Sequence, residues 1–235
     1  LACWIIDRDN PLTARVAINR IWQSVFGIGI VRTSEDFGLR GERPSHPELL
    51  DWLAIEFPRR DWSMKAMLRL IVTSATYRQT SRVSEEAYLR DPENRLLGRG
   101  ARFRVDAEIV RDIALSASGL LSRKLGGPSV FPEQPAGITE KLEFGVFEWK
   151  TDTGEDRYRR GLYTHWKRAA PYPSSMIFDS PGRMLTCSRR TRSSNPLQAL
   201  TVLNDPVFFE AAVHLGRRIQ QDEGESVRDR IESGV

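Results

Sequence analysis

Asx-Pro pairs constrain the fold of this chain more than any other feature, because each pair predicts the first turn of a helix. The Asn or Asp side chain accepts hydrogen bonds from amide groups of that turn, and proline fits there because its missing N–H would be unpaired anyway. The pairs stand at Asn10-Pro11, Asp91-Pro92, Asn195-Pro196 and Asp205-Pro206. Together they predict a mainly helical protein.

Apolar residues recur with the helical period behind several of these starts. The first stripe follows Asn10 and stops at Gly27, and glycine is typical of a helix end. Ser45 and Glu48 have the spacing of a capping box, in which Ser45 is the N-cap and Glu48 reaches back to it. Ser63 is predicted to begin the next helix.

Three further helices are predicted in the second half of the chain. The longest runs over about 105–121, and its apolar stripe consists of Ile109, Val110, Ile113, Ala114, Ala117 and Leu121. A pair of helices follows, over about 196–203 and 206–220. Each has an apolar face that needs cover, so we expect the pair to pack on the 105–121 helix.

The expected fold class is therefore mainly α: a single helical domain over residues 1–221, with long ordered loops and one small β-hairpin. The hairpin is expected between about 143 and 168, where an aromatic-rich stretch contains the turn 152–154, and a helix over 158–166 is the alternative. Residues 222–235 are charged, and we expect that tail to fray. The opening residues lack the order of a signal peptide, and we expect the chain to be a piece of a longer protein.

The composition excludes several classes of protein. The chain is 40% hydrophobic and 28% charged, as is ordinary for a globular protein, and no run approaches the roughly 20 apolar residues of a membrane span. Cys3 and Cys187 lie outside haem-attachment and zinc motifs, and the three histidines are far apart, so we expect no cofactor and no metal in this chain. The Gly-x-Gly of "FGIGIV" lacks the third glycine and the preceding strand of a dinucleotide fingerprint.

Two carboxylates are candidates for acid–base chemistry. Glu108 and Asp112 stand four residues apart in "VDAEIVRD" and share a helix face, a spacing that suits a proton-transfer pair. His165 is a third catalytic candidate, because histidine is the side chain most often used as a general acid or base. The alternative is an ordinary surface face, in which Arg111 pairs with a carboxylate elsewhere.

Basic residues gather in one segment of the second half. Residues 157–192 contain nine Lys or Arg against one acid, which leaves +8 locally, and since the whole chain carries +4, the remainder carries about −4. Arg189, Arg190 and Arg192 lie directly before Asn195, whose helix presents free amides, so phosphate, sulfate or carboxylate would fit there. The alternative is that these arginines pair with acids of this chain, such as those of "TSEDFG" or "VDAEIVRD".

The string "YTHWKR" adds aromatic residues to the same segment. A sugar ring or a base stacks on aromatic side chains, and cations beside them hold its charged groups. The alternative is a strand with Trp166 in the core and His165 satisfied internally. The candidate ligand-binding residues are therefore Arg159, Arg160, Tyr163, Trp166, Lys167, Arg168, Arg189, Arg190 and Arg192.

Six strings in order along the chain carry a family resemblance: "NPLTARVAINRIWQSVFGIGIVRTSEDFGLRGERPSHPELLDWLA", "TSATYRQTSR", "RFRVDAEIVRD", "GLLSRKLGGPSVFP", "DTGEDRYRRGLYTHWKR" and "RRTRSSNPLQALTVLNDPVF". From about residue 5 to 220 the chain resembles a C-terminal domain of unknown function. That domain occurs in large planctomycete and verrucomicrobial proteins that often carry a planctomycete-type cytochrome c domain. Asn195 stands where the family more often has Thr, and it keeps the helix cap.

The resemblance implies an exported, multidomain protein, periplasmic or extracellular, with a link to polysaccharide breakdown. Any haem c would lie in another domain, and the family offers no catalytic residues to carry over. Our first hypothesis is an accessory domain that binds anionic polysaccharide, or neighbouring domains of the same protein, through residues 157–192. The alternatives are a carbohydrate-active enzyme domain and a nucleic-acid-binding helical domain. The mild net charge and the expected export argue against nucleic acid.

Overall fold

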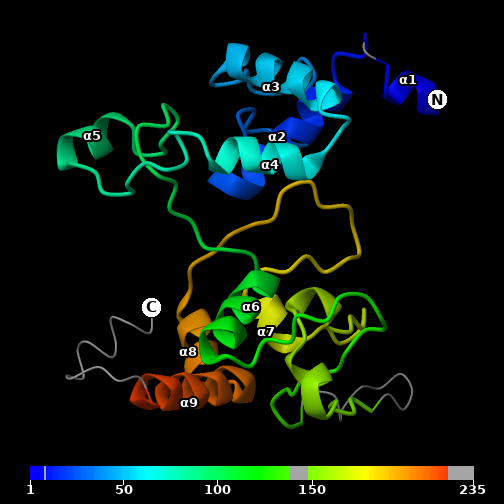
Figure 1. The fold of residues 1–235 in the computed structure, drawn as a ribbon, viewed down its shortest axis with the longest axis vertical. Helices are drawn as coiled ribbons and strands as arrows, with labels where there is room; N and C mark the ends of the chain where they lie inside the picture. The colour runs from blue at the N-terminus through cyan, green and yellow to red at the C-terminus, as the bar shows by residue number, and fades with distance from the viewer. Residues whose placement is uncertain (8, 138–147, 222–235) are drawn as a thin grey trace. The chain divides into compact units, whose positions relative to one another are not determined.

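The chain is mainly helical, as predicted, and it divides into two compact units, Leu1–Phe103 and Arg104–Val235. The computed structural model describes residues 1–7, 9–137 and 148–221 (Figure 1). Within these ranges, β structure is limited to isolated bridges. The predicted tail over 222–235 lies outside the described residues. The division into units does not test the prediction of one domain, which stays a prediction.

The first unit contains five helices among its described residues. The core lies where α2, α3 and α4 meet, and it is built from Ile18, Leu53 and Met67 with their neighbours. The helices are α1 (Ala2–Ile5), α2 (Thr13–Phe26), α3 (Pro47–Arg59), α4 (Met64–Val72) and α5 (Glu85–Arg90). The predicted helix end at Gly27 and the predicted start at Ser63 are confirmed, and the Ser63 hydroxyl accepts a hydrogen bond from the Ala66 amide.

The two glycines of the Gly-x-Gly after α2 are needed for the turn that follows the helix and do not form a ligand-binding loop. Gly27 has a φ of +83°, which favours glycine, and it ends α2. A Cβ on Gly29 would lie 2.5 Å from the carbonyl oxygen of Val31 and 2.6 Å from Nδ2 of Asn19. The buried Asn19 amide group holds Val31 through two hydrogen bonds, of 2.9 and 2.8 Å. This contact brings the loop back over α2.

Three predicted helix caps are wrong. Asn10 is not the cap of α2, because the helix begins at Thr13 with Leu12 as its N-cap; the Asn10 side chain accepts from the amides of Leu12 and Thr13, where the helix begins.

Ser45 is not the cap of α3, because the helix begins one residue later and His46 is its N-cap. The Ser45 hydroxyl instead donates to the carbonyl of Ile30 and lies 3.0 Å from Nδ1 of His46. Asp91 does not start a helix but ends α5, and its carboxylate accepts from the amides of the turn that follows, at residues 95 and 96.

The second unit is organised around α6 (Ala107–Ser118), which packs on α9 (Pro206–Gln221). Its other helices are η1 (Gly154–Tyr158), η2 (Gly161–Tyr163), α7 (Pro173–Ile177) and α8 (Pro196–Asn204). A small apolar core joins α6, α7 and α9 through Ala107, Phe178 and Phe208. The predicted packing of the last helix pair on the long helix is confirmed for α9.

The face that α6 buries matches the predicted one only in part. Val110 and Ala114 pack against the small apolar core, as predicted. Ile109 and Ile113 are about half exposed, whereas Arg111 and Leu115 are buried. Arg111 turns inward because its guanidinium donates to the carbonyl of Arg157, at 2.7 Å, rather than to a carboxylate. Burial lowers the pKa of this guanidinium. An apolar stripe alone therefore misplaces the face by about one position.

The described part of the predicted hairpin, residues 148–168, forms η1 and η2 instead of strands; residues 143–147 lie outside the described residues. Its backbone pairs with the loop after α6, since Ser122 N–H donates to Tyr158 and Val130 exchanges hydrogen bonds with the segment at residues 163 and 165. The two resulting bridges are parallel. These partners replace the local pairing that a hairpin would supply.

Candidate anion-binding site

A loop rich in arginine connects α7 to α8 within the second unit, and we call residues 180–192 the arginine loop. Its neck is closed by Asp179, whose carboxylate accepts from the amide of Ser193 at 2.8 Å and from its hydroxyl at 2.9 Å. Asp179 also pairs with Arg104. Asp179 has a φ of +61°, a left-handed conformation that Asp tolerates better than most residues. The neck fixes both ends of the loop on one side chain.

Two of the three clustered arginines tie the loop to the start of α6. Arg190 forms a two-pronged ion pair with Glu108, with nitrogen–oxygen distances of 2.6 and 3.2 Å, and Arg192 lies 3.5 Å from a carboxylate oxygen of Asp106. Burial opposes ionisation of Glu108, but the hydrogen bond and charge of Arg190 outweigh it and hold the pKa of Glu108 below its usual range. The alternative of internal pairing with "VDAEIVRD" therefore holds for Arg190 and Arg192. Arg189 is exposed.

The three catalytic candidates have different hydrogen-bond and ring partners. Glu108 pairs with Arg190, whereas Asp112 accepts from the Gly161 amide at 2.7 Å and from Arg160 at 3.0 Å. Gly161 is needed there, because a Cβ would lie 2.7 Å from the carbonyl oxygen of Glu108. Both carboxylates thus hold loops against α6.

His165 lies in an aromatic cluster. Its ring stacks on Phe131, with ring centres 4.5 Å apart, and meets Trp149 edge to face at 6.4 Å. Its backbone amide donates to the carbonyl of Val130. His165 is therefore held by contacts within the fold, as the alternative interpretation of this segment expected.

Arg159 lies inside the unit and is only 1% exposed. Its guanidinium donates to three backbone carbonyls of the loop after α6, those of Lys124, Gly126 and Pro128. It also lies over the ring of Tyr163, 3.8 Å from the ring centre, and the Tyr163 hydroxyl accepts from the Gly126 amide. These two predicted ligand-binding residues therefore shape the loop over 124–128.

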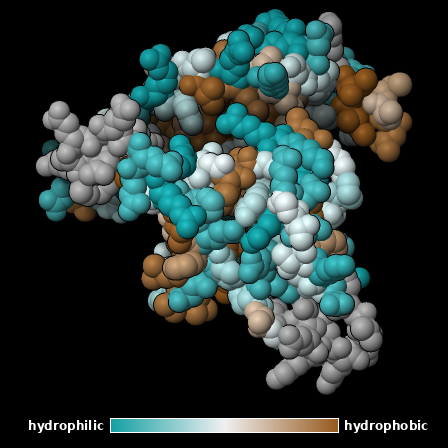
Figure 2. Space-filling view, turned by 60° about the horizontal axis from the view of Figure 1, so that its bottom comes forward, coloured by the Kyte–Doolittle hydropathy of each residue, from teal (hydrophilic) through white to brown (hydrophobic). Residues whose placement is uncertain are grey.

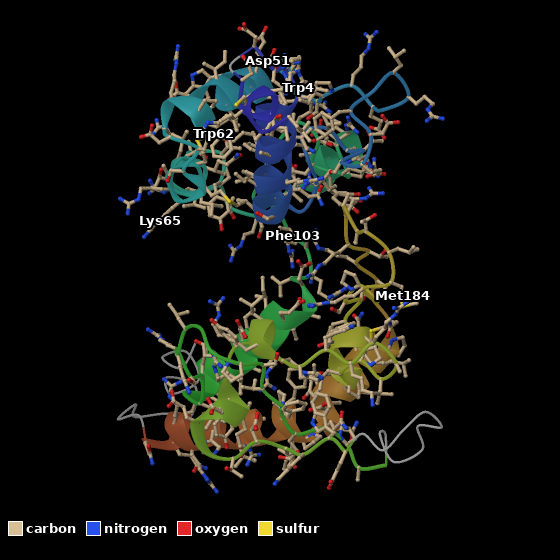
Figure 3. The ribbon with its side chains drawn as sticks, turned by 90° about the vertical axis from the view of Figure 1, so that its right-hand side faces the viewer. Trp4, Asp51, Trp62, Lys65, Phe103 and Met184 are labelled. Carbon is tan, nitrogen blue, oxygen red and sulfur yellow. The ribbon has the colours of Figure 1, made fainter. Side chains whose placement is uncertain are left out.

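Two of the remaining predicted residues, Trp166 and Arg168, contact the arginine loop. The guanidinium of Arg183 lies over the ring of Trp166, 4.8 Å from its centre, and Nε of Arg168 lies against the sulfur of Met184. Figure 3 labels Met184 on this loop. Lys167 lies in the turn at residues 167–170. In the described ranges, neither Arg168 nor Arg183 forms an ion pair with a carboxylate. We call Trp166, Arg168 and Arg183 the platform.

Sequence reasoning missed Arg183 as a site residue, because it stands alone between Gly182 and Met184 and only the fold brings it to Trp166. It also missed a polar network in the same unit. Arg157 donates to Glu133 at 2.6 Å and to Glu210 at 3.1 Å, and Glu210 accepts from the hydroxyl of Tyr158 at 2.8 Å. No sequence spacing links these four residues.

Among the described residues, no group of three or more His, Cys, Asp or Glu side chains is placed to hold a metal ion. Of the helices in the described ranges, none has both the length and the apolar composition that a membrane span requires. Cys3 and Cys187 are both free and exposed.

The fold and the arginine loop thus define a mainly helical protein with a cationic surface segment. The family model described as PSD1, protein of unknown function (DUF1553), matches residues 1–235, and the chain belongs to this family. No curated protein and no solved structure matches the chain.

Proposed function

We propose that the second unit is a non-catalytic binding module that holds an anionic polysaccharide on the platform of Trp166, Arg168 and Arg183. The observation that carries the proposal is a pair of exposed arginines, Arg183 over the ring of Trp166 and Arg168 against Met184, neither of which forms an ion pair with a carboxylate in the described ranges. Their charge is therefore available to a ligand, unlike that of Arg190.

The position of Arg183 over Trp166 suits recognition of sulfate or carboxylate. A guanidinium held at an aromatic face by a cation–π contact still has N–H donors that a planar or tetrahedral anion accepts in pairs. Trp166 thus orients the charge. A flexible lysine at this position would have to be ordered by the ligand itself, which costs side-chain entropy.

The closed neck supports the same proposal. Asp179 and Ser193 hold the two ends of the arginine loop, and Arg190 anchors its base to Glu108. A loop held at these points loses less conformational entropy when it binds, so weak charge contacts suffice for affinity. The paired arginines therefore act as supports and the unpaired ones as ligand contacts.

We test the proposal by titrating the whole chain with a sulfated glucan oligosaccharide and with an oligogalacturonate, at several salt concentrations. We expect weak binding that falls as salt rises, because salt screens exposed charges. The double variant Arg168→Gln, Arg183→Gln should bind at least about 10-fold more weakly, which corresponds to about 1.4 kcal/mol. Arg123→Gln is the matched control, since Arg123 is an exposed arginine of the same unit outside residues 157–192.

Absence of binding by either anionic sugar at low salt would exclude this function. If the platform variant and Arg123→Gln lost the same amount of binding affinity, the binding would depend on net charge alone and not on the platform. A duplex DNA titration serves as the third arm, and tighter binding to DNA than to both sugars would favour the nucleic-acid alternative. The enzyme alternative receives no support from Glu108, Asp112 and His165, which lie in separate contacts.

The wider setting remains part of the proposal. We infer a module of an exported, periplasmic or extracellular protein whose neighbouring domains include a cytochrome c, with haem held outside this chain. A polysaccharide-binding module would keep such a protein near its substrate. Detection of haem c by absorption spectroscopy in the purified full-length protein tests that setting independently of sugar binding.

A further inference from the structure

The exposed side of α4, in the first unit, carries two parallel rows of side chains. Met64, Leu68 and Val72 follow one another every four residues and are 59%, 37% and 37% exposed. We call them the apolar row. Lys65 and Arg69 have the same spacing, are both exposed, and form the basic row. Residues four apart are neighbours on one helix face, and the rows start at successive residues, so they lie side by side.

The buried residues of α4 fix the direction of the two rows. Met67 and Ile71 point into the core of the first unit. With 3.6 residues per turn, the apolar row lies next to these buried residues, and the basic row lies about 160° away from them. The cations are therefore furthest from the core, and Lys65 projects from α4 into solvent (Figure 3).

The positive charge of this stretch is not neutralised by carboxylates. Residues 62–84 contain no Asp or Glu and four basic residues, which are Lys65, Arg69, Arg78 and Arg82. All four are exposed, and none of them takes part in an ion pair within the described ranges. Helix α3 differs, because the two arginines at its end share Glu56. The charge of α4 is thus available to an anionic partner.

We propose that the apolar row and the basic row bind the surface of an anionic lipid bilayer. The boundary between lipid headgroups and acyl chains offers what both rows require: phosphate groups for the cations and hydrocarbon for the apolar side chains. A soluble polyanion offers charge alone and would leave the apolar row in water. Such a peripheral contact needs no membrane-spanning helix. It is independent of the platform, whose residues belong to the other unit.

The geometry of α4 suits contact with a flat surface. The centres of the two rows are about 80° apart around the helix, so both rows reach one plane when the helix lies parallel to it. Lysine and arginine have long apolar stems, so their charged ends stay at the level of the headgroups while the apolar row enters the boundary. On the side of the first unit that Figure 2 shows, hydrophobic and hydrophilic residues likewise lie side by side.

Flotation of the whole chain with lipid vesicles at low salt tests the proposal. We expect binding to phosphatidylcholine vesicles that contain about one-third phosphatidylglycerol and not to phosphatidylcholine alone, because the anionic surface attracts the basic row. The variant Lys65→Gln, Arg69→Gln should bind at least about 10-fold more weakly. The matched control Arg40→Gln, Arg43→Gln removes the same charge from two exposed arginines of the loop before α3, and it should weaken binding by less than about 3-fold.

A second variant distinguishes a bilayer contact from attraction by charge alone. Met64→Gln, Leu68→Gln keeps every charge, and it should bind at least about 5-fold more weakly because less apolar surface enters the boundary. The control is Leu89→Gln on α5, a leucine that is 73% exposed and lies outside the two rows. Circular dichroism and thermal melts establish that each variant is folded.

Several outcomes would overturn the proposal. One is the absence of binding at low salt, and another is equal binding to neutral and anionic vesicles. A third is an apolar-row variant that binds as tightly as the wild type; the partner would then be a soluble polyanion, which titration of a sulfated glucan into the basic-row variant identifies. The platform variant Arg168→Gln, Arg183→Gln should keep its vesicle binding, so failure of sugar binding leaves this test intact. Loss of vesicle binding in that variant would assign the lipid to the platform instead.

Discussion

At the scale of single residues, two contacts decide the course of loops that no local pattern specifies. Gly29 allows Val31 to approach the buried side chain of Asn19, and Gly161 allows η2 to lie against α6 at Glu108. At both positions glycine is required because a Cβ would overlap neighbouring atoms, and not because the backbone has a positive φ. Single contacts also determine which arginines can bind a ligand. Arg190 is paired with Glu108, so it holds the loop in place and is not available to an anion.

Replacing Gly29 with alanine should lower the free energy of unfolding by about 1–3 kcal/mol, because the added Cβ overlaps the Val31 carbonyl and forces the loop off Asn19. Urea unfolding followed by tryptophan fluorescence measures the loss. Gly98→Ala is the matched control: nothing lies within 4 Å of a Cβ there, so its change should stay below about 1 kcal/mol. Equal losses at the two positions would contradict the close approach at Gly29.

Replacing Glu108 with glutamine should lower the free energy of unfolding by about 1–3 kcal/mol at neutral pH, because a charge-assisted pair with Arg190 is lost. Since the pKa of Glu108 is held below its unfolded value, its contribution is full above about pH 5 and declines as pH falls through the folded pKa. The difference between wild type and variant should therefore shrink with acid.

The control for this pH dependence is Glu86→Gln, which removes an exposed helix pair with Arg90. Such surface pairs contribute about 0.5 kcal/mol or less, so the control should change little between pH 7 and pH 3. Urea unfolding at a series of pH values provides the measurement. A difference for Glu108→Gln that stays constant with pH would mean that packing, not charge, is what Glu108 contributes.

At the scale of elements, caps and buried faces follow different rules. The caps at Asn195 and Asp205 depend on residues next to the helix, and both side chains accept from amides of the first turn, as predicted. The buried face of α6 depends on distant partners, above all on the Arg157 carbonyl that draws Arg111 inward. The cap of α3 shows the same dependence, because the Ile30 carbonyl takes the hydroxyl of Ser45.

Asp205→Ala should lower the free energy of unfolding by about 0.5–2 kcal/mol, the usual cost of a lost N-cap. Asp205→Asn keeps an oxygen that accepts from the Val207 amide, so it should cost less than alanine. Burial raises the pKa of Asp205, so removing its charge relieves a desolvation cost as well. Thermal or urea unfolding at pH 7 compares the two variants, and a larger loss for asparagine than for alanine would contradict the capping role.

At the scale of the whole molecule, each unit has a core of its own. The first core surrounds Met67 and the second surrounds Phe208, and no buried residue belongs to both clusters. The second core is small, and polar contacts of Arg111, Arg159 and Arg157 supplement it. Stability therefore depends on apolar burial in the first unit and on apolar burial together with polar contacts of arginines in the second.

Met67→Ala and Phe208→Ala should each lower the free energy of unfolding by about 2–5 kcal/mol, because each leaves a cavity in a closely packed cluster. Since the two clusters share no residue, the loss in the double variant should equal the sum within about 0.5 kcal/mol. Urea unfolding of the three variants measures this. A discrepancy above about 1 kcal/mol would show that the two cores are coupled.

The sequence by itself determined the helical class, the C-terminal end of α2 at Gly27, the start of α4 at Ser63, and the caps of α8 and α9. Each of these features depends on residues within one or two helical turns of one another. The confirmed packing of α9 on α6 also followed, because both helices carry an apolar stripe. Only the tertiary structure decided which arginines are neutralised, since a guanidinium such as that of Arg190 meets its carboxylate across 82 residues of chain. It likewise decided that α8 buries Gln198, because the carbonyls that hold this side chain inward come from outside the helix.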